Sequence, residues 1–203
     1  MHIQSKNHTS EEFSEIQKKI TREHIPWLIC FLIYFAYGLA AYLFSLTRTA
    51  ESLGSRIAKL EQWFVVFRTV DKVSFEIGKN LDGLKTFLLL MYAGSCIFGL
   101  YSLLYPFKGE IISNTVKILS MRRTPRLSIF FAVLFSTVLS IGWYLLFPFS
   151  ESDIASEWDK VNLSGSFSAS LGLFLMSAAG AAFNVIAIPI FFYSVFGNSR
   201  VIK

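Results

Sequence analysis

The chain has 203 residues, of which 53% are hydrophobic and only 16% charged, and its formal net charge at neutral pH is +5. A soluble domain of this length carries about a quarter charged residues. The composition therefore excludes an ordinary soluble domain and predicts an integral membrane protein.

The apolar residues are gathered into four stretches rather than spread through the chain. None of the four contains Asp, Glu, Lys, Arg or His, and each has at least the ~20 residues that a helix needs to cross a bilayer. They cover residues 26–46, 86–107, 127–147 and 167–196. The predicted fold is an all-α integral membrane protein with four transmembrane helices. The first stretch lies too deep in the chain and is too long for a cleaved signal peptide.

Residues 1–25 are expected to form a short amphipathic segment ahead of the first span. Thr9 and Glu12 have the spacing of a capping box. Apolar residues then recur at helical spacing, at Phe13, Ile16 and Ile20. Pro26 suits the start of the next helix or a kink.

Residues 47–85 are predicted to be an extramembrane helical connection between spans one and two. The stretch "LEQWFVVFR" at residues 60–68 is too short to cross a bilayer and too apolar for a solvated loop. Apolar residues recur at helical spacing before and through this stretch, in the series Leu53, Ile57, Leu60, Phe64 and Phe67. We interpret the stretch as one face of a helix. The candidate interaction surface is Leu60, Trp63, Phe64 and Phe67, and the alternative is a face that covers the end of its own bundle.

Basic residues near the span ends set the expected orientation. Residues 1–25, 108–126 and 197–203 hold eleven Lys and Arg, whereas 47–85 and 148–166 hold eight. The connection at 108–126 ends in a dense basic cluster, and the one at 148–166 carries four acidic residues against a single lysine. Dense basic loops stay in the cytoplasm. We expect both termini to be cytoplasmic, and lipid headgroups to be contacted by Arg122, Arg123 and Arg126.

The fourth stretch contains a cluster of small residues, "SAAGAA", followed by an asparagine. Small residues four apart allow helix backbones to approach closely. The residues expected to set this packing are Ser177, Gly180, Ala181 and Asn184. Asn184 is expected to bond to a neighbouring helix, with a pore-lining position as the alternative, and Pro189 to kink the helix.

No pattern in the sequence indicates catalysis, a metal or a cofactor. The two cysteines lie inside predicted spans, and the three histidines precede the first span without ligand spacing. The spans contain no ionisable residue of the kind that marks an ion path or a proton relay. We therefore predict no catalytic, metal or cofactor-binding residues.

The first functional hypothesis is a non-enzymatic protein of an inner membrane that acts by protein–protein interaction, as an immunity- or exclusion-like factor or a subunit of a membrane or secretion complex. A second is a self-assembling homo-oligomeric channel or pore subunit. A membrane enzyme or carrier is a third, without nominated residues. The expected partners are membrane lipid and either further copies of the chain or another membrane protein, and no nucleic acid.

Overall fold

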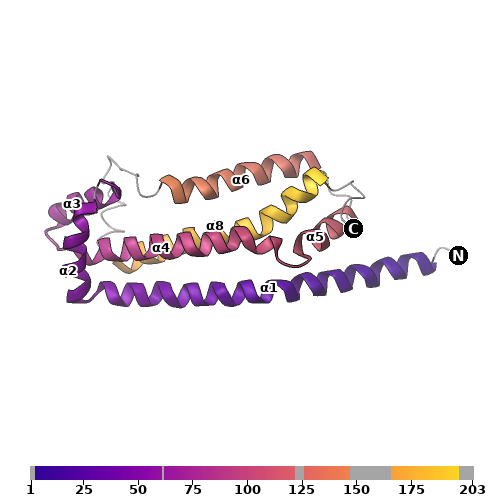
Figure 1. Cartoon of the computed structure of the whole chain (residues 1–203), viewed down its shortest axis with the longest axis horizontal. Helices are drawn as coiled ribbons and strands as arrows, with labels where there is room; N and C mark the ends of the chain where they lie inside the picture. The colour runs from indigo at the N-terminus through magenta and orange to yellow at the C-terminus, as the bar shows by residue number, and fades with distance from the viewer. Residues whose placement is uncertain (1–2, 61, 122–125, 147–165, 197–203) are drawn as a thin grey trace. The chain divides into compact units, whose positions relative to one another are not determined.

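The computed structural model describes residues 3–60, 62–121, 126–146 and 166–196, and these residues form helices and the turns that join them (Figure 1). The helices follow one another in the order α1 (Ile3–Ser45), α2 (Arg48–Ile57), η1 (Ala58–Leu60), α3 (Val66–Ile77), α4 (Asp82–Leu104), η2 (Tyr105–Phe107), α5 (Ile111–Met121), α6 (Arg126–Leu146) and α8 (Ser166–Phe196). The two η elements are single turns of 3₁₀ helix. The predicted all-α fold is confirmed over this part of the chain.

Three helical segments in the described residues are long and apolar enough to cross a membrane: Ser10–Ser45, Asp82–Phe107 and Ser177–Phe196. The apolar part of α6 that meets the same composition, Arg126–Gly142, is shorter. Four spans were expected, and the described residues contain three helices of this kind. Large apolar side chains are exposed along them, among them Ile33 and Ile97 at 63% and 73%. Such faces suit contact with hydrocarbon rather than water.

Helix α1 runs without a break from Ile3–Ser45 and includes Pro26. The residues before and after Pro26 therefore belong to one helix rather than to two, and no helix starts at Pro26. A proline inside a helix removes the backbone hydrogen bond to the carbonyl four residues earlier, here that of Arg22. The helix also begins well before Thr9, so Thr9 and Glu12 do not cap it.

Side-chain contacts on both sides of Pro26 explain why α1 continues. The indole Nε1–H of Trp27 donates to Ser102 Oγ in α4 at 3.0 Å. The hydroxyl of Tyr105 in η2 donates to the backbone carbonyl of Glu23. These bonds fasten the helix one residue after the proline and three residues before it, so the lost bond is surrounded by tertiary contacts.

The first half of α1 packs on α5 through its apolar face. Ile16 is buried, and Phe13 and Ile20 are half-buried, so the predicted face is turned toward the protein. Beside it, Lys117 Nζ of α5 lies 2.7 Å from Glu12 Oε1. The described part of the amphipathic segment therefore packs on the rest of the fold.

The described residues pack in two units. One unit contains the first part of α1, the last turns of α4, η2, α5, most of α6 and the end of α8, within residues 1–30, 100–140 and 181–203. Its buried cluster is Tyr105, Ile111 and Val185, with Trp27 and Tyr101 against it. The other unit contains the second part of α1, α2, α3, most of α4 and the start of α8, within residues 31–99 and 141–180.

The second unit is held by a hydroxyl cluster between α1, α4 and α8. Tyr34 Oη lies 2.6 Å from both Ser95 Oγ and Ser177 Oγ, and Tyr34 is 5% exposed. Its ring also stacks on Phe98 of α4, with centroids 4.7 Å apart. One phenol thus joins three helices while satisfying three hydroxyl groups that would be costly to bury unpaired.

Candidate functional site

The connection between α1 and α4 folds into a small platform rather than the single helical face expected from the sequence. Helix α2 ends at Ile57, η1 adds one turn, and α3 begins only at Val66. Gly78 closes α3 in the left-handed conformation, with φ of 63°. We call α2, η1 and α3, residues 48–77, the platform.

A close backbone approach fastens the platform to α4 at its α2 side, and a second one lies between α4 and the last residue of α1. A Cβ added to Gly54 would lie 2.0 Å from the carbonyl oxygen of Asp82, and one added to Gly83 would lie 2.3 Å from that of Ser45. Only glycine fits such distances. Between them, Thr86 Oγ1 donates to the carbonyl oxygen of Ala50 at 2.8 Å.

An ion cluster fastens the platform at its α3 side. The ammonium group of Lys85 lies 2.5 Å from Asp71 Oδ1 of α3 and 3.3 Å from Asp82 Oδ1 of α4. Lys85 is 3% exposed, so its charge is compensated by two carboxylates rather than by water. Removing one partner of a buried pair leaves an uncompensated charge. This cluster therefore fixes α3 to the first turn of α4.

Aromatic and apolar packing fills the space beneath α3. Phe67, Val70 and Val73 are almost fully buried, at 0%, 1% and 0% exposure. The ring of Phe64 stacks on Phe67 with centroids 5.4 Å apart and meets the edge of Tyr92 of α4 at the same distance.

The expected interaction surface is therefore divided between the inside and the outside of the platform. Leu60 and Trp63 are exposed, at 40% and 68%. Phe64 is half-buried and Phe67 is fully buried. The prediction that Phe67 belongs to an exposed surface is wrong, because this side chain packs beneath α3. The alternative interpretation, in which the stretch covers the bundle end, describes Phe64 and Phe67.

A further aromatic residue lies on the outer face of the platform. Phe75 of α3 is 89% exposed, the highest value among the large apolar residues that are exposed in the described chain. We call Leu60, Trp63 and Phe75 the exposed apolar set. Sequence reasoning missed Phe75, although its neighbours Lys72, Glu76 and Lys79 mark the polar face of a helix on which an aromatic is out of place.

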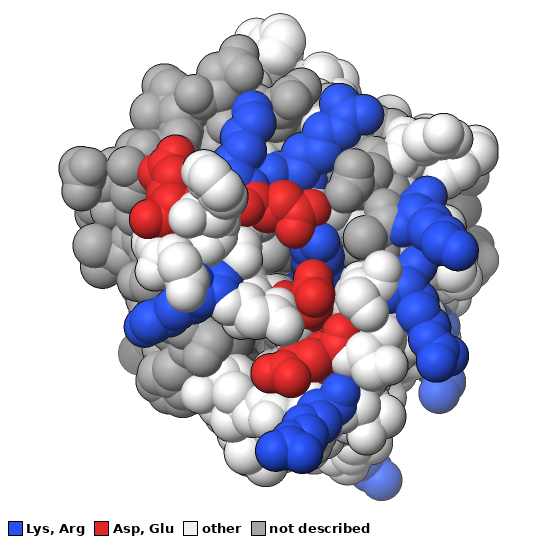
Figure 2. Space-filling view, turned by 90° about the vertical axis from the view of Figure 1, so that its left-hand side faces the viewer, with Lys and Arg blue, Asp and Glu red and all other residues white. Residues whose placement is uncertain are grey.

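The platform carries exposed charged residues of both signs as well as the exposed apolar set. Figure 2 shows the end of the molecule that carries α2 and α3, where basic and acidic side chains are interleaved. The exposed charged residues of the platform are Arg48, Glu51, Arg56, Lys59, Arg68, Lys72 and Glu76. Exposed aromatics together with polar and charged residues of both signs are typical of surfaces that bind another protein.

The small-residue face of α8 is buried inside the chain. Ser177, Ala181 and Asn184 are 3%, 0% and 1% exposed, and Gly180 is half-buried. The expected bond from Asn184 to a neighbouring helix is absent: among the described residues, neither its Nδ2 nor its Oδ1 has a hydrogen-bond partner. Instead, Ser177 makes the interhelical bond, to Tyr34.

Of the three arginines expected at the headgroups, one can be placed. Arg122 and Arg123 lie outside the described residues. The guanidinium carbon of Arg126, at the start of α6, lies 5.5 Å from the ring centroid of Tyr193 in α8. This is a cation–π contact, and headgroup binding by Arg126 stays a prediction.

Comparison with known proteins finds no family model, no curated protein and no solved structure that matches this chain.

Proposed function

We propose that this chain is a four-span protein of an inner membrane, with both termini in the cytoplasm, and that it acts without catalysis by binding another protein through the exposed apolar set. The observation that carries the proposal is the pairing of exposed aromatics with a fixed support. Trp63 and Phe75 are exposed, while the platform beneath them is held by Lys85, Gly54 and Phe67. A pre-organised aromatic surface binds with a smaller loss of conformational entropy than a mobile one.

The span that this proposal adds to those three helices is α6. The helix has 21 residues and no Asp, Glu, Lys, Arg or His after Arg126. Its outward faces are apolar, with exposed side chains at Leu127, Phe131, Leu134, Phe135, Val138, Leu139 and Ile141. An apolar helix exposed on so many sides is stable in hydrocarbon and costly in water.

The proposed topology places Ser55 on the outer side of the membrane and Ser10 on the cytoplasmic side. Both residues are exposed, so a cysteine at either position is open to a maleimide that cannot cross the membrane. We expect Ser55→Cys to react in intact cells and Ser10→Cys to react only after the membrane is opened. The parent chain, whose Cys30 and Cys96 are both half-buried, gives the background. The reverse pattern would invert the topology.

Site-specific photocrosslinking in the native membrane tests the proposed partner surface. A photoreactive phenylalanine analogue replaces Trp63 or Phe75, and the matched control carries it at Leu39, a 51% exposed residue of the first span. We expect one discrete protein adduct from both platform positions and none from Leu39. We expect the Trp63→Ser change to abolish the adduct formed from Phe75.

Three results would contradict this proposal. Adducts with lipid alone would show that Trp63 and Phe75 lie at the membrane–water interface and anchor the chain there. The same adduct from Leu39 would show that the platform is not selective. An adduct with twice the mass of the chain would favour self-assembly.

Self-assembly into a homo-oligomer, as a channel or pore subunit, is the second candidate. One observation favours it: Ala36 and Ala40, two small residues four apart in the first span, are exposed rather than packed inside the chain. Small residues at this spacing let two helices approach closely in a membrane. A closed ring of copies with a central opening would support this candidate over the first.

A further inference from the structure

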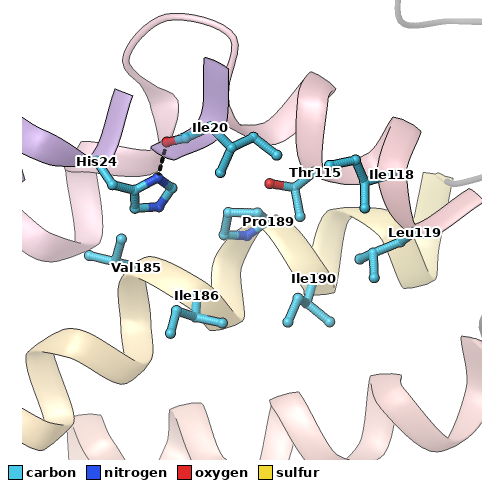
Figure 3. Close-up of a pocket in the computed structure, with 9 residues that line it drawn as sticks. All are labelled: Ile20, His24, Thr115, Ile118, Leu119, Val185, Ile186, Pro189 and Ile190. Carbon is cyan, nitrogen blue, oxygen red and sulfur yellow. Dashed lines mark hydrogen bonds between the residues drawn. The ribbon is translucent and has the colours of Figure 1, made fainter. Parts of the chain in front are cut away.

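An apolar cavity of about 220 Å³ lies between α1, α5 and α8, within one of the two packing units. Figure 3 shows that each helix contributes side chains to its wall. The lining residues are Ile20 and His24 of α1, Thr115, Ile118 and Leu119 of α5, and Val185, Ile186, Pro189 and Ile190 of α8. The lining side chains are apolar apart from the imidazole of His24 and the hydroxyl of Thr115.

The two polar groups of the wall leave its apolar character intact. His24 Nδ1 lies 2.7 Å from the carbonyl oxygen of Ile20, and a carbonyl only accepts hydrogen bonds, so Nδ1 carries a proton that it donates there (Figure 3). Thr115 is the remaining polar side chain of the wall. An occupant must therefore be apolar along most of its length.

The cavity is open to the surroundings of the helices. Ile186 forms part of its wall and is nevertheless 58% exposed. In the proposed membrane arrangement, the lining residues of α1 stand just before the first span, and those of α5 just before the third. The opening is then near the boundary between headgroups and hydrocarbon, where lipid chains are the apolar material at hand.

A basic group contacts α8 one helical turn beyond the lining residue Pro189. Tyr193 follows the lining residue Pro189 by four positions in α8, so both occupy the same side of that helix. The guanidinium carbon of Arg126 lies 5.5 Å from the Tyr193 ring centroid. An arginine can bind a phosphate with two parallel hydrogen bonds. An apolar wall with a cation about one helical turn beyond it complements an anionic amphiphile.

We propose that this cavity binds one acyl chain of an anionic phospholipid, with the lipid phosphate at Arg126. The site is distinct from the platform and belongs to the other packing unit, so it does not depend on the proposed protein partner. It does depend on membrane insertion.

The test uses the full-length protein, purified and delipidated in detergent, with phosphatidylglycerol and phosphatidylcholine of identical acyl chains as probes. Native mass spectrometry counts retained lipids, and the thermal midpoint is measured with and without each lipid. Ile190→Trp fills the cavity and Arg126→Gln removes the cation. The matched controls are Ile97→Trp, on a 73% exposed position of α4, and Arg48→Gln, on the exposed surface of α2.

We expect the parent chain to retain one phosphatidylglycerol and to gain more thermal stability from it than from phosphatidylcholine. Ile190→Trp should lose both the retained lipid and the lipid-induced rise, whereas Arg126→Gln should lose only the preference for the anionic lipid. Both controls should behave as the parent. If Ile190→Trp does not fold, Thr115→Leu serves as a smaller filling of the same wall, with the same expected loss.

Two results would overturn the proposal. Equal retention of the anionic lipid by the parent and the cavity-filled chain would place the lipid elsewhere. An equal loss in Ile97→Trp would show a non-specific lipid annulus. Neither result bears on the photocrosslinking of the platform.

Discussion

Phe67→Ala is expected to lower the free energy of unfolding by about 3–5 kcal/mol, the usual cost of deleting a fully buried phenylalanine ring. The side chain has no exposed area and stacks on Phe64, which in turn meets Tyr92 of α4. Its removal leaves a cavity beneath α3 that the surrounding helices fill only in part. The measurement is thermal or denaturant unfolding of the purified protein in one detergent.

The matched control is Phe75→Ala, in the same helix and with the same chemical change. Phe75 is 89% exposed, so its removal is expected to change stability by less than about 0.5 kcal/mol. The two variants should separate stability from binding. Phe67→Ala loses stability, whereas Phe75→Ala keeps it and loses the partner. Equal destabilisation by the two variants would place Phe75 in a contact of its own and remove it from the exposed apolar set.

The helices were the most predictable part of this fold, because uninterrupted apolar stretches such as residues 86–107 carry a strong local signal. The break inside the connection was not predictable in the same way. The series Leu53, Ile57, Leu60 and Phe64 fits one helix, and periodicity alone does not reveal a turn within it. What turns the chain is tertiary: Gly54 fits against Asp82 in α4, and Phe64 against Tyr92.

Pro26 shows the reverse relation between local and tertiary effects. A proline and an interfacial tryptophan next to it predict a helix boundary by local rules. The hydrogen bonds that fasten Glu23 and Trp27 to η2 and α4 come from residues more than 70 positions away. No local pattern in residues 1–30 announces those partners, so the continuous α1 could not be predicted from them.

The candidate site was predictable in part for a similar reason. The stretch "LEQWFVVFR" led to the right region of the chain, and Leu60 and Trp63 are exposed as a binding surface requires. Which of its aromatics face inward depends on where α4 lies. Phe75 escaped prediction because it lies outside the apolar series that drew attention to the connection.

The close approach of α2 to α4 makes Gly54 sensitive to substitution. An alanine Cβ at Gly54 would lie 2.0 Å from the carbonyl oxygen of Asp82, a distance that real Cβ atoms essentially never show. Since backbone lies on both sides, no side chain can rotate away, and α2 must move from the first turn of α4. That movement also stretches the hydrogen bond from Thr86 to the Ala50 carbonyl.

Gly54→Ala is therefore expected to destabilise the protein even though alanine is the better helix former. Overpacking costs about 1–3 kcal/mol or more, against a gain of up to about 1 kcal/mol in helix propensity.

Gly142→Ala in α6 is the matched control, because a Cβ there meets no described atom within 4 Å. Only the propensity gain acts at Gly142, so this variant should be as stable as the parent or slightly more so. Thermal unfolding should show a lower midpoint for Gly54→Ala and an unchanged or slightly higher midpoint for Gly142→Ala. A shift of the same sign and size for both would show that α2 is not held against α4. Trp63 and Phe75 would then lack the fixed support on which the proposed binding surface rests.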